Sequence, residues 1–153
     1  MTTEMQFTTT INAPVEKVFD LIADLARYEQ WLSSSNLYGS MTKLSDNPAK
    51  LGTTYVDKGK TSVMQGMVTE YEAPRHITFQ QSTKSKVLIF NITVIIRIRY
   101  TLDSTKQGTQ VRRDIALDIE GIPGFAKSII IKQIRAENER ILEKMKAHLE
   151  KSN

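Results

Sequence analysis

The feature that most limits the fold of this chain is a change of hydrophobic period at residues 121–124, which read GIPG. Between Leu37 and Glu120 the pattern has a period of two, and turn sequences such as DKGK, EAPRH and DSTKQG interrupt it at short intervals. This pattern predicts about six strands. Their connections are too short for crossover helices, so the strands should be mostly antiparallel. After GIPG, the remaining residues follow the period of a helix.

The N-terminal segment should add one strand and two short helices. Residues 4–11 alternate weakly, as a strand does, and Pro14 suits the first position of a helix, where its missing amide hydrogen is not needed. The apolar residues after Pro14 recur at helical spacing to about Asp24, and a second short helix should carry Tyr28 and Trp31. The expected order is one strand, two helices, six strands and one long helix, in a single α+β domain over residues 1–153.

Two predicted lengths indicate a curved sheet. A strand over residues 90–102 would extend about 40 Å, and a helix over residues 124–150 would have about the same length. A compact domain of this size has a radius of gyration of only about 15 Å. The sheet must therefore twist and curl around the helix, which leaves a concave space between them.

Composition excludes some classes of function. The 153 residues contain no cysteine, so no disulfide or thiolate chemistry is expected. The first residues, MTTEMQFTTT, lack a secretory signal pattern, and we expect a cytoplasmic protein. The apolar run VLIFNITVIIRIRYTL is broken by Asn91, Arg97 and Arg99, so it is too short and too charged for stable membrane insertion.

The net charge of +4 does not by itself indicate a nucleic-acid partner. Arg97, Arg99 and Arg112 should share the outer face of the sheet as a basic patch. Asp114 and Asp118 interrupt this patch, and no exposed aromatic stacking partners are evident. A solvated sheet face is the favoured interpretation, and we expect no nucleic-acid binding. The oligomeric state is left open.

Several segments resemble the SRPBCC or START-like superfamily, which includes polyketide cyclase/dehydrase and lipid-transport members. They are INAPVEKVFDLIADLARYEQWLSS, LGTTYVDKG, GMVTEYEAPRHITF, QGTQVRRDIALDIEG and the terminal helix, and they cover nearly the whole chain. The resemblance implies a helix-grip fold, in which a seven-stranded antiparallel sheet wraps a long C-terminal helix around a cavity for an apolar ligand. The superfamily hosts lipid carriers, aromatase/cyclases, chaperone activators and oxygenase domains, so the fold does not specify the function.

Two polar residues fall on surfaces that should face this cavity. Asn138 lies within the apolar stripe of the last helix, either bonded within the protein or anchoring a ligand. In VRRDIALDI, alternation turns Arg113 inward, beside Tyr100 if the two strands form a hairpin. Arg113 could hold a ligand carboxylate or phosphate, pair with Glu70, or place its charge at the cavity rim.

The other candidate ligand-binding residues are bulky and apolar. We expect them to form the cavity wall, although each is also a plausible core residue. Met64 and Met67, three apart in a strand, should face opposite sides. The candidate wall residues are Trp31, Tyr55, Met64, Phe90, Tyr100, Ile131 and Ile134.

No catalytic residues, metal site or cofactor can be assigned. There is no GxSxG motif, and His76 and His148 lack a recognisable metal-ligand spacing. The favoured function is carriage or sequestration of a small hydrophobic or amphipathic molecule. One alternative is a cyclase/dehydratase-type enzyme in which Arg113, Tyr100 or Glu70 assists proton transfer. Another is a protein-interaction module of the chaperone-activator type, using the outer sheet face.

Overall fold

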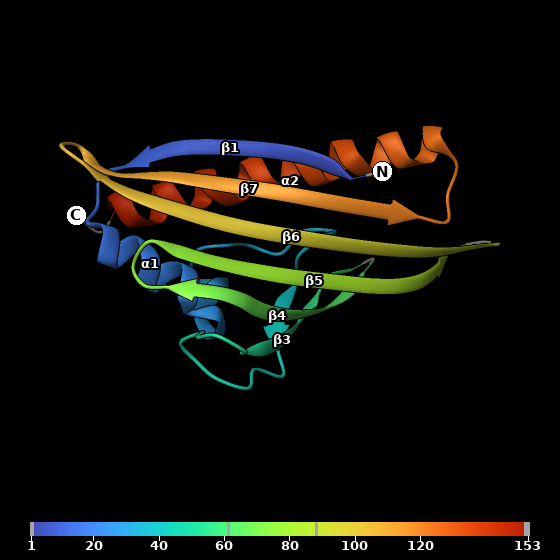
Figure 1. Ribbon diagram of the computed structural model, residues 1–153, viewed down its shortest axis with the longest axis horizontal. Helices are drawn as coiled ribbons and strands as arrows, with labels where there is room; N and C mark the ends of the chain where they lie inside the picture. Colours follow the sequence, from blue (N-terminus) through green and yellow to red (C-terminus); the bar gives the residue numbers. More distant parts are fainter. Residues whose placement is uncertain (1, 61, 88, 152–153) are drawn as a thin grey trace.

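The computed structural model describes residues 2–60, 62–87 and 89–151, with seven strands and three helices among them (Figure 1). The helices are α1 (Val15–Ala23), the 3-10 helix η1 (Leu25–Gln30) and α2 (Gly124–Lys151). The strands are β1 (Thr3–Ile11), β2 (Ser40–Thr42), β3 (Thr54–Lys58), β4 (Val63–Glu72), β5 (His76–Val87), β6 (Phe90–Thr105) and β7 (Gly108–Glu120).

The strands form one antiparallel sheet in the order β1-β7-β6-β5-β4-β3-β2. Strands β2 to β7 follow one another as neighbours, whereas β1 pairs with β7 at the far edge. Helices α1 and η1 therefore connect the two edge strands of the sheet. This is the helix-grip fold, and the predicted α+β class, strand number and strand direction are confirmed.

Helix α2 runs along the sheet beside its long strands, as Figure 1 shows. It is anchored to the N-terminal segment at its end, where Glu150 Oε2 accepts a hydrogen bond from the amide of Asn12 at 2.9 Å. Its C-terminal half packs into the core through Leu142, Met145 and Leu149. Its N-terminal half instead borders a cavity, so the space between sheet and helix is filled at one end only.

Helix α1 contributes an apolar face to the filled end. Val18, Phe19 and Ile22 are buried there, at the spacing of one helix face. Pro14 precedes α1 as its N-cap residue, and Trp31 follows η1 as its C-cap residue, so each lies one position outside the helix in which the sequence placed it. Such one-residue differences are usual at helix ends.

A β-bulge decides which face of β4 carries Glu70. The pairing of β4 with β5 shifts register between Val68 and Glu70. Alternation alone would place Glu70 on the same face as Met64 and Val68, which are buried. Glu70 is instead exposed and accepts a hydrogen bond from Thr78 Oγ1 at 2.9 Å. Met67 is 44% exposed, so Met64 and Met67 do face opposite sides.

Candidate ligand-binding site

A cavity of about 290 Å³ lies between the sheet and the N-terminal half of α2. Strands β3 to β7, the segment before β2 and helix α2 all contribute to its wall. Much of the wall is apolar because the inward positions of β6, Phe79 of β5 and three isoleucines of α2 face the cavity. These include Phe79, Ile92, Val94, Ile96, Ile98, Ile130, Ile134 and Ile141.

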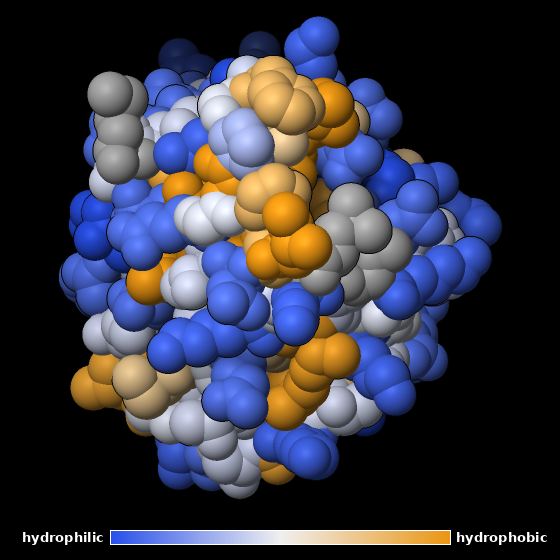
Figure 2. Space-filling view, turned by 90° about the vertical axis from the view of Figure 1, so that its right-hand side faces the viewer, coloured by the Kyte–Doolittle hydropathy of each residue, from blue (hydrophilic) through white to orange (hydrophobic). Residues whose placement is uncertain are grey.

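Apolar side chains also gather on the surface at the end of the molecule where α2 begins (Figure 2). Phe125 and Ile129 in the first turns of α2 are 77% and 57% exposed, and Ile89 in the β5–β6 turn is 83% exposed. The close approach of Gly121 to the carbonyl oxygen of Asn91 holds the start of α2 near the start of β6. Ile92 and Ile130, which line the cavity, belong to the same two segments.

The first polar group of the cavity is centred on Arg113 of β7. Its side chain is 5% exposed, and its Nε donates a hydrogen bond to Asn138 Oδ1 at 2.7 Å. A second guanidinium nitrogen, Nη1, donates to the hydroxyl oxygen of Tyr100, the residue opposite Arg113 in the β6–β7 register. Alternation and the hairpin thus placed Arg113 and Tyr100 correctly.

The charge of Arg113 has no counter-ion among the described residues. The ion pairs found there involve other side chains, and Glu70 lies on the opposite face of the sheet. The guanidinium carbon instead lies 5.0 Å from the centroid of the Tyr100 ring, at cation–π distance. Burial raises the pKa of Tyr100 and Arg113 opposes that rise, so the phenol stays neutral at physiological pH.

The second polar group lies on strands β3 and β5. The Tyr55 hydroxyl donates to Gln81 Oε1 at 2.7 Å, and Gln81 Nε2 lies 3.5 Å from both Asp57 Oδ2 and Met64 Sδ. Gly66 makes room for the Tyr55 ring, since a Cβ atom there would lie 2.2 Å from Tyr55 Cζ. The small residue on β4 therefore allows this aromatic side chain to reach Gln81.

Asp57 is the carboxyl group of this second polar group. Its Oδ1 is buried and has no hydrogen-bond partner among the described residues. Burial raises its pKa from 3.8 to about 7, helped by Glu137, while the hydrogen bond with Gln81 and the charge of Arg113 act in the opposite direction. Both protonation states are therefore accessible near neutral pH.

Glu137 of α2 also borders the cavity, but its carboxylate is already engaged. One oxygen lies 2.5 Å from Arg140 Nη2, and the other accepts a hydrogen bond from Ser35 Oγ at 2.6 Å. Ser35 belongs to the segment between η1 and β2, so these contacts join that segment to the helix.

The structure brings six of the nine sequence-predicted residues to the cavity and leaves three outside its wall. Trp31 is buried against Tyr28, with ring centroids 5.0 Å apart, and Phe90 and Ile131 pack at the edge of the core. That any of the nine binds a ligand stays a prediction. The residues in the wall are Tyr55, Met64, Tyr100, Arg113, Ile134 and Asn138.

Sequence reasoning missed the polar residues Asp57, Gln81 and Glu137. A signal for Asp57 was present, because Tyr55 and Asp57 share a face if residues 54–58 form a strand. However, Asp57 is also the first residue of the turn sequence DKGK, so the sequence pattern assigned it to a turn. Asn138 proved to be bonded within the protein, since its Nδ2 donates to the carbonyl oxygen of Ile134 at 2.8 Å.

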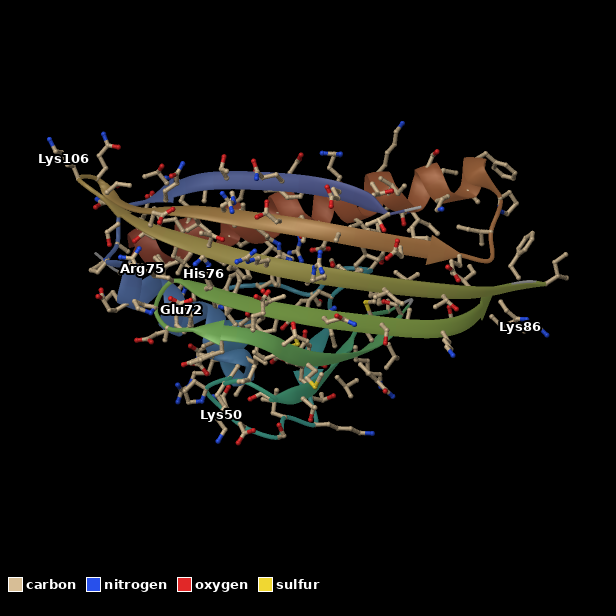
Figure 3. The ribbon with its side chains drawn as sticks, viewed as in Figure 1. Lys50, Glu72, Arg75, His76, Lys86 and Lys106 are labelled. Atoms are coloured by element: carbon tan, nitrogen blue, oxygen red, sulfur yellow. The ribbon has the colours of Figure 1, made fainter. Side chains whose placement is uncertain are left out.

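Charged residues outside the cavity lie at several separate places on the surface. His76 lies beside the β4–β5 turn near Glu72 and Arg75, whereas Lys86 and Lys106 mark opposite ends of the long strands (Figure 3). Within the described ranges, no three His, Cys, Asp or Glu side chains are grouped to hold a metal ion. None of the helices described is both long and apolar enough to span a membrane.

The outer face of the sheet carries the basic residues that the sequence suggested. Arg112 Nε donates to Asp114 Oδ2 at 3.0 Å, and Asp114 also accepts a hydrogen bond from Gln6. Arg99 pairs with Asp114 across the β6–β7 ladder, and Arg97 is exposed two residues earlier. Acidic and basic groups are thus interspersed on this face.

A profile of the family described as polyketide cyclase/dehydrase and lipid transport matches residues 2–150. The chain belongs to this family. No curated protein matches the sequence of this family member. Solved structures are similar at low sequence identity, and their similarity shows the fold alone.

Three of these structures illustrate the range of proteins that this polyketide cyclase/dehydrase family member resembles. Protein MLL2253 from Mesorhizobium loti is 15% identical, with a TM-score of 0.73 and 99% of each chain covered. The Aha1 dimer from Colwellia psychrerythraea is 14% identical, with a TM-score of 0.68, 97% of this chain and 96% of the other covered. The di-domain ARO/CYC StfQ from the steffimycin biosynthetic pathway is 9% identical, with a TM-score of 0.74. The match covers 99% of this chain but only 52% of the length of StfQ.

Proposed function

We propose that this protein binds a small hydrophobic or amphipathic molecule in the cavity between the sheet and α2. The observation that carries the proposal is a buried guanidinium, that of Arg113, without a counter-ion among the described residues, in the wall of an otherwise largely apolar cavity. Membership of a family described by lipid transport and polyketide chemistry supports it. The protein would carry or sequester its ligand.

The chemistry of Arg113 indicates how the ligand would be oriented. A buried charge is unfavourable unless it is paired and hydrogen-bonded. Asn138 and Tyr100 are neutral partners, so neither neutralises the positive charge. A carboxylate or carbonyl oxygen on the ligand would accept a hydrogen bond from this guanidinium, while the apolar body of the ligand would occupy the aliphatic part of the cavity.

Native mass spectrometry of the purified protein, with extraction of any bound molecule, tests for carriage. Dodecanoate binding, measured by calorimetry on delipidated protein, tests the role of Arg113. We expect Arg113→Met, which keeps most of the side-chain bulk, to weaken dodecanoate binding about tenfold or more, because a charge-assisted hydrogen bond is lost. Arg99→Met, on the exposed face of β6, should bind as the wild type does. Equal binding by Arg113→Met and wild type would contradict the role of Arg113.

A second candidate function is a cyclase/dehydratase-type reaction, and Asp57 is the observation that favours it. A carboxyl group with a pKa of about 7 can both accept and donate protons near neutral pH. Conversion of the extracted molecule by the wild-type protein, and its loss in Asp57→Asn, would support catalysis. Release of the molecule unchanged would support carriage. The similarity to Aha1 concerns the fold and adds no support for a protein-interaction module.

A further inference from the structure

Two buried polar atoms in the cavity wall lack hydrogen-bond partners among the described residues. They are Asp57 Oδ1 and the hydroxyl oxygen of Tyr38, and both side chains line the cavity. Tyr38 is 4% exposed, so its hydroxyl group is not satisfied by bulk solvent. Buried polar side chains are nearly always hydrogen-bonded, so two unpartnered atoms in the same cavity indicate a place where a polar group of a ligand fits.

Backbone packing brings these two residues to the same end of the cavity. Met41 of β2 pairs with Asp57 of β3, and the chain runs into β2 directly after Tyr38. Gly39 lies against Lys58, since a Cβ atom there would be 2.1 Å from the carbonyl oxygen of Lys58. The segment containing Tyr38 therefore runs alongside the end of β3. The proximity has an electrostatic effect, because burial and then Asp57 raise the pKa of Tyr38 to about 12.

We propose that Asp57 and Tyr38 form a second polar subsite of the cavity, which binds a hydroxyl group of the ligand. This inference rests on the proposed function. A hydroxyl group is complementary to the pair, because it can donate to the Asp57 carboxylate and accept from the Tyr38 phenol. The subsite is separate from the Arg113 group, which offers donors for an anionic or carbonyl oxygen.

The surrounding charges favour a hydroxyl group over an ammonium group. The charged groups that influence Asp57 are Glu137 and Arg113, and those that influence Tyr38, besides Asp57, are Glu29 and Arg140. Glu137 is already paired with Arg140 and Ser35, so it is not available to a ligand cation. The positive charge of Arg113 borders the same cavity and would repel one.

The two polar groups are separated by a row of aromatic rings. The Phe79 ring centroid lies 6.0 Å from that of Tyr55 and 6.4 Å from that of Tyr100, with both pairs arranged edge to face. Tyr55 belongs to the Asp57 group, and Tyr100 to the Arg113 group. The ligand class is therefore a molecule with an apolar middle, an anionic or carbonyl oxygen at one end and a hydroxyl group at the other.

Matched fatty acids test this assignment. Calorimetry on delipidated protein would compare dodecanoate, 12-hydroxydodecanoate and 12-aminododecanoate, whose flexible chains do not impose a fixed distance between the end groups. We expect the hydroxylated acid to bind the wild type about fivefold more tightly than dodecanoate, because one buried hydrogen bond is gained. 12-Aminododecanoate should bind more weakly than 12-hydroxydodecanoate.

Variants connect this preference to the two residues. Asp57→Ala should reduce the preference for the hydroxylated acid to less than about twofold. Tyr38→Phe, which keeps the ring, should reduce the preference in part. Asp103→Ala is the matched control, because Asp103 is an exposed aspartate that pairs with Arg75 outside the cavity. It should keep the wild-type preference.

The outcomes separate this subsite from the proposed function. If the wild type binds dodecanoate but shows no preference for the hydroxylated acid, or if Asp57→Ala keeps the preference, the subsite is wrong while the cavity site stands. Tighter binding of 12-aminododecanoate than of 12-hydroxydodecanoate would overturn the assignment of a hydroxyl group. If the wild type binds none of the three acids, both the subsite and the proposed function are contradicted.

Discussion

Asn138 holds Arg113 from the helix side of the cavity, with its Oδ1 accepting a hydrogen bond from Arg113 Nε at 2.7 Å. The amide orientation is determined by the helix itself, because Asn138 Nδ2 donates to the carbonyl oxygen of Ile134 at 2.8 Å. The oxygen must then face β7. A single amide thus joins α2 to the sheet and orients the guanidinium but does not neutralise its charge.

Replacing this amide by a carboxylate should weaken the binding of anionic ligands. In Asn138→Asp, the new carboxylate would pair with Arg113 and neutralise the charge that attracts a ligand anion. We expect dodecanoate to bind at least tenfold more weakly to Asn138→Asp, a loss typical of one charge-assisted hydrogen bond. Calorimetry measures this loss, and circular dichroism checks that the fold is kept. Unchanged dodecanoate affinity in a folded Asn138→Asp protein would show that Arg113 does not bind the carboxylate.

Stability should depend on pH through Asp57. Its pKa is raised from 3.8 to about 7 in the folded state, so the fold favours the neutral acid. The stability that this preference contributes is present below pH 4 and is lost as the pH rises to about 7. Asp57→Asn, which cannot ionise, should therefore increase the free energy of unfolding at pH 8 and change it much less at pH 4.

Urea denaturation at the two pH values measures this effect. Asp103→Asn provides the control, because Asp103 is an exposed aspartate whose replacement should have a small effect at pH 8. An Asp57→Asn protein that is no more stable than the wild type at pH 8 would be inconsistent with a raised pKa.

Adding even a methyl side chain at Gly66 should lower the stability of the protein. An alanine Cβ atom at this position would lie 2.2 Å from Tyr55 Cζ and 2.6 Å from its hydroxyl oxygen, so the ring would have to move away from Gln81. We expect Gly66→Ala to lower the free energy of unfolding by about 1–3 kcal/mol. Gly124→Ala is the matched control, because no atom lies within 4 Å of its Cβ position, and it should change stability by less than about 0.5 kcal/mol. Similar stabilities of the two variants would argue against the close packing of Gly66 on Tyr55.

The only tryptophan should support the fold without contacting a ligand. Trp31 is 7% exposed and packs edge-on against Tyr28, outside the residues that line the cavity. We expect Trp31→Phe to lower the free energy of unfolding by about 1–2 kcal/mol through lost burial, and to change dodecanoate affinity by less than twofold. Denaturation and calorimetry on the same preparation separate the two effects. A large loss of dodecanoate affinity in the folded variant would instead indicate that Trp31 contributes to the binding site.

Local sequence patterns predicted much of the fold because they report side-chain direction. The two-residue period of a strand predicted that Arg113 points inward. The short DSTKQG connection predicted that it lies beside Tyr100, as the strand register shows. Helical spacing similarly placed Asn138 on the buried face of α2. Each inference needed only the geometry of one element or one hairpin.

The same patterns could not determine which neighbouring residues border the cavity. Ile130 lines it and Ile131 does not, because packing of the helix against the sheet sets the rotation of α2 about its axis. The bulge in β4 reversed the face of Glu70. The polar surroundings of Asp57 became recognisable only when Tyr38, Gln81 and Glu137 were brought around it from other elements.

The sequence by itself determined the elements, their order and the inward direction of Arg113, since these depend on residue spacing along one strand or helix. Only the tertiary structure decided that the space beneath the sheet is open at one end and that its wall contains two distinct polar groups. The physical reason is that a cavity and its unpartnered atoms depend on how side chains from separate elements fill a shared volume.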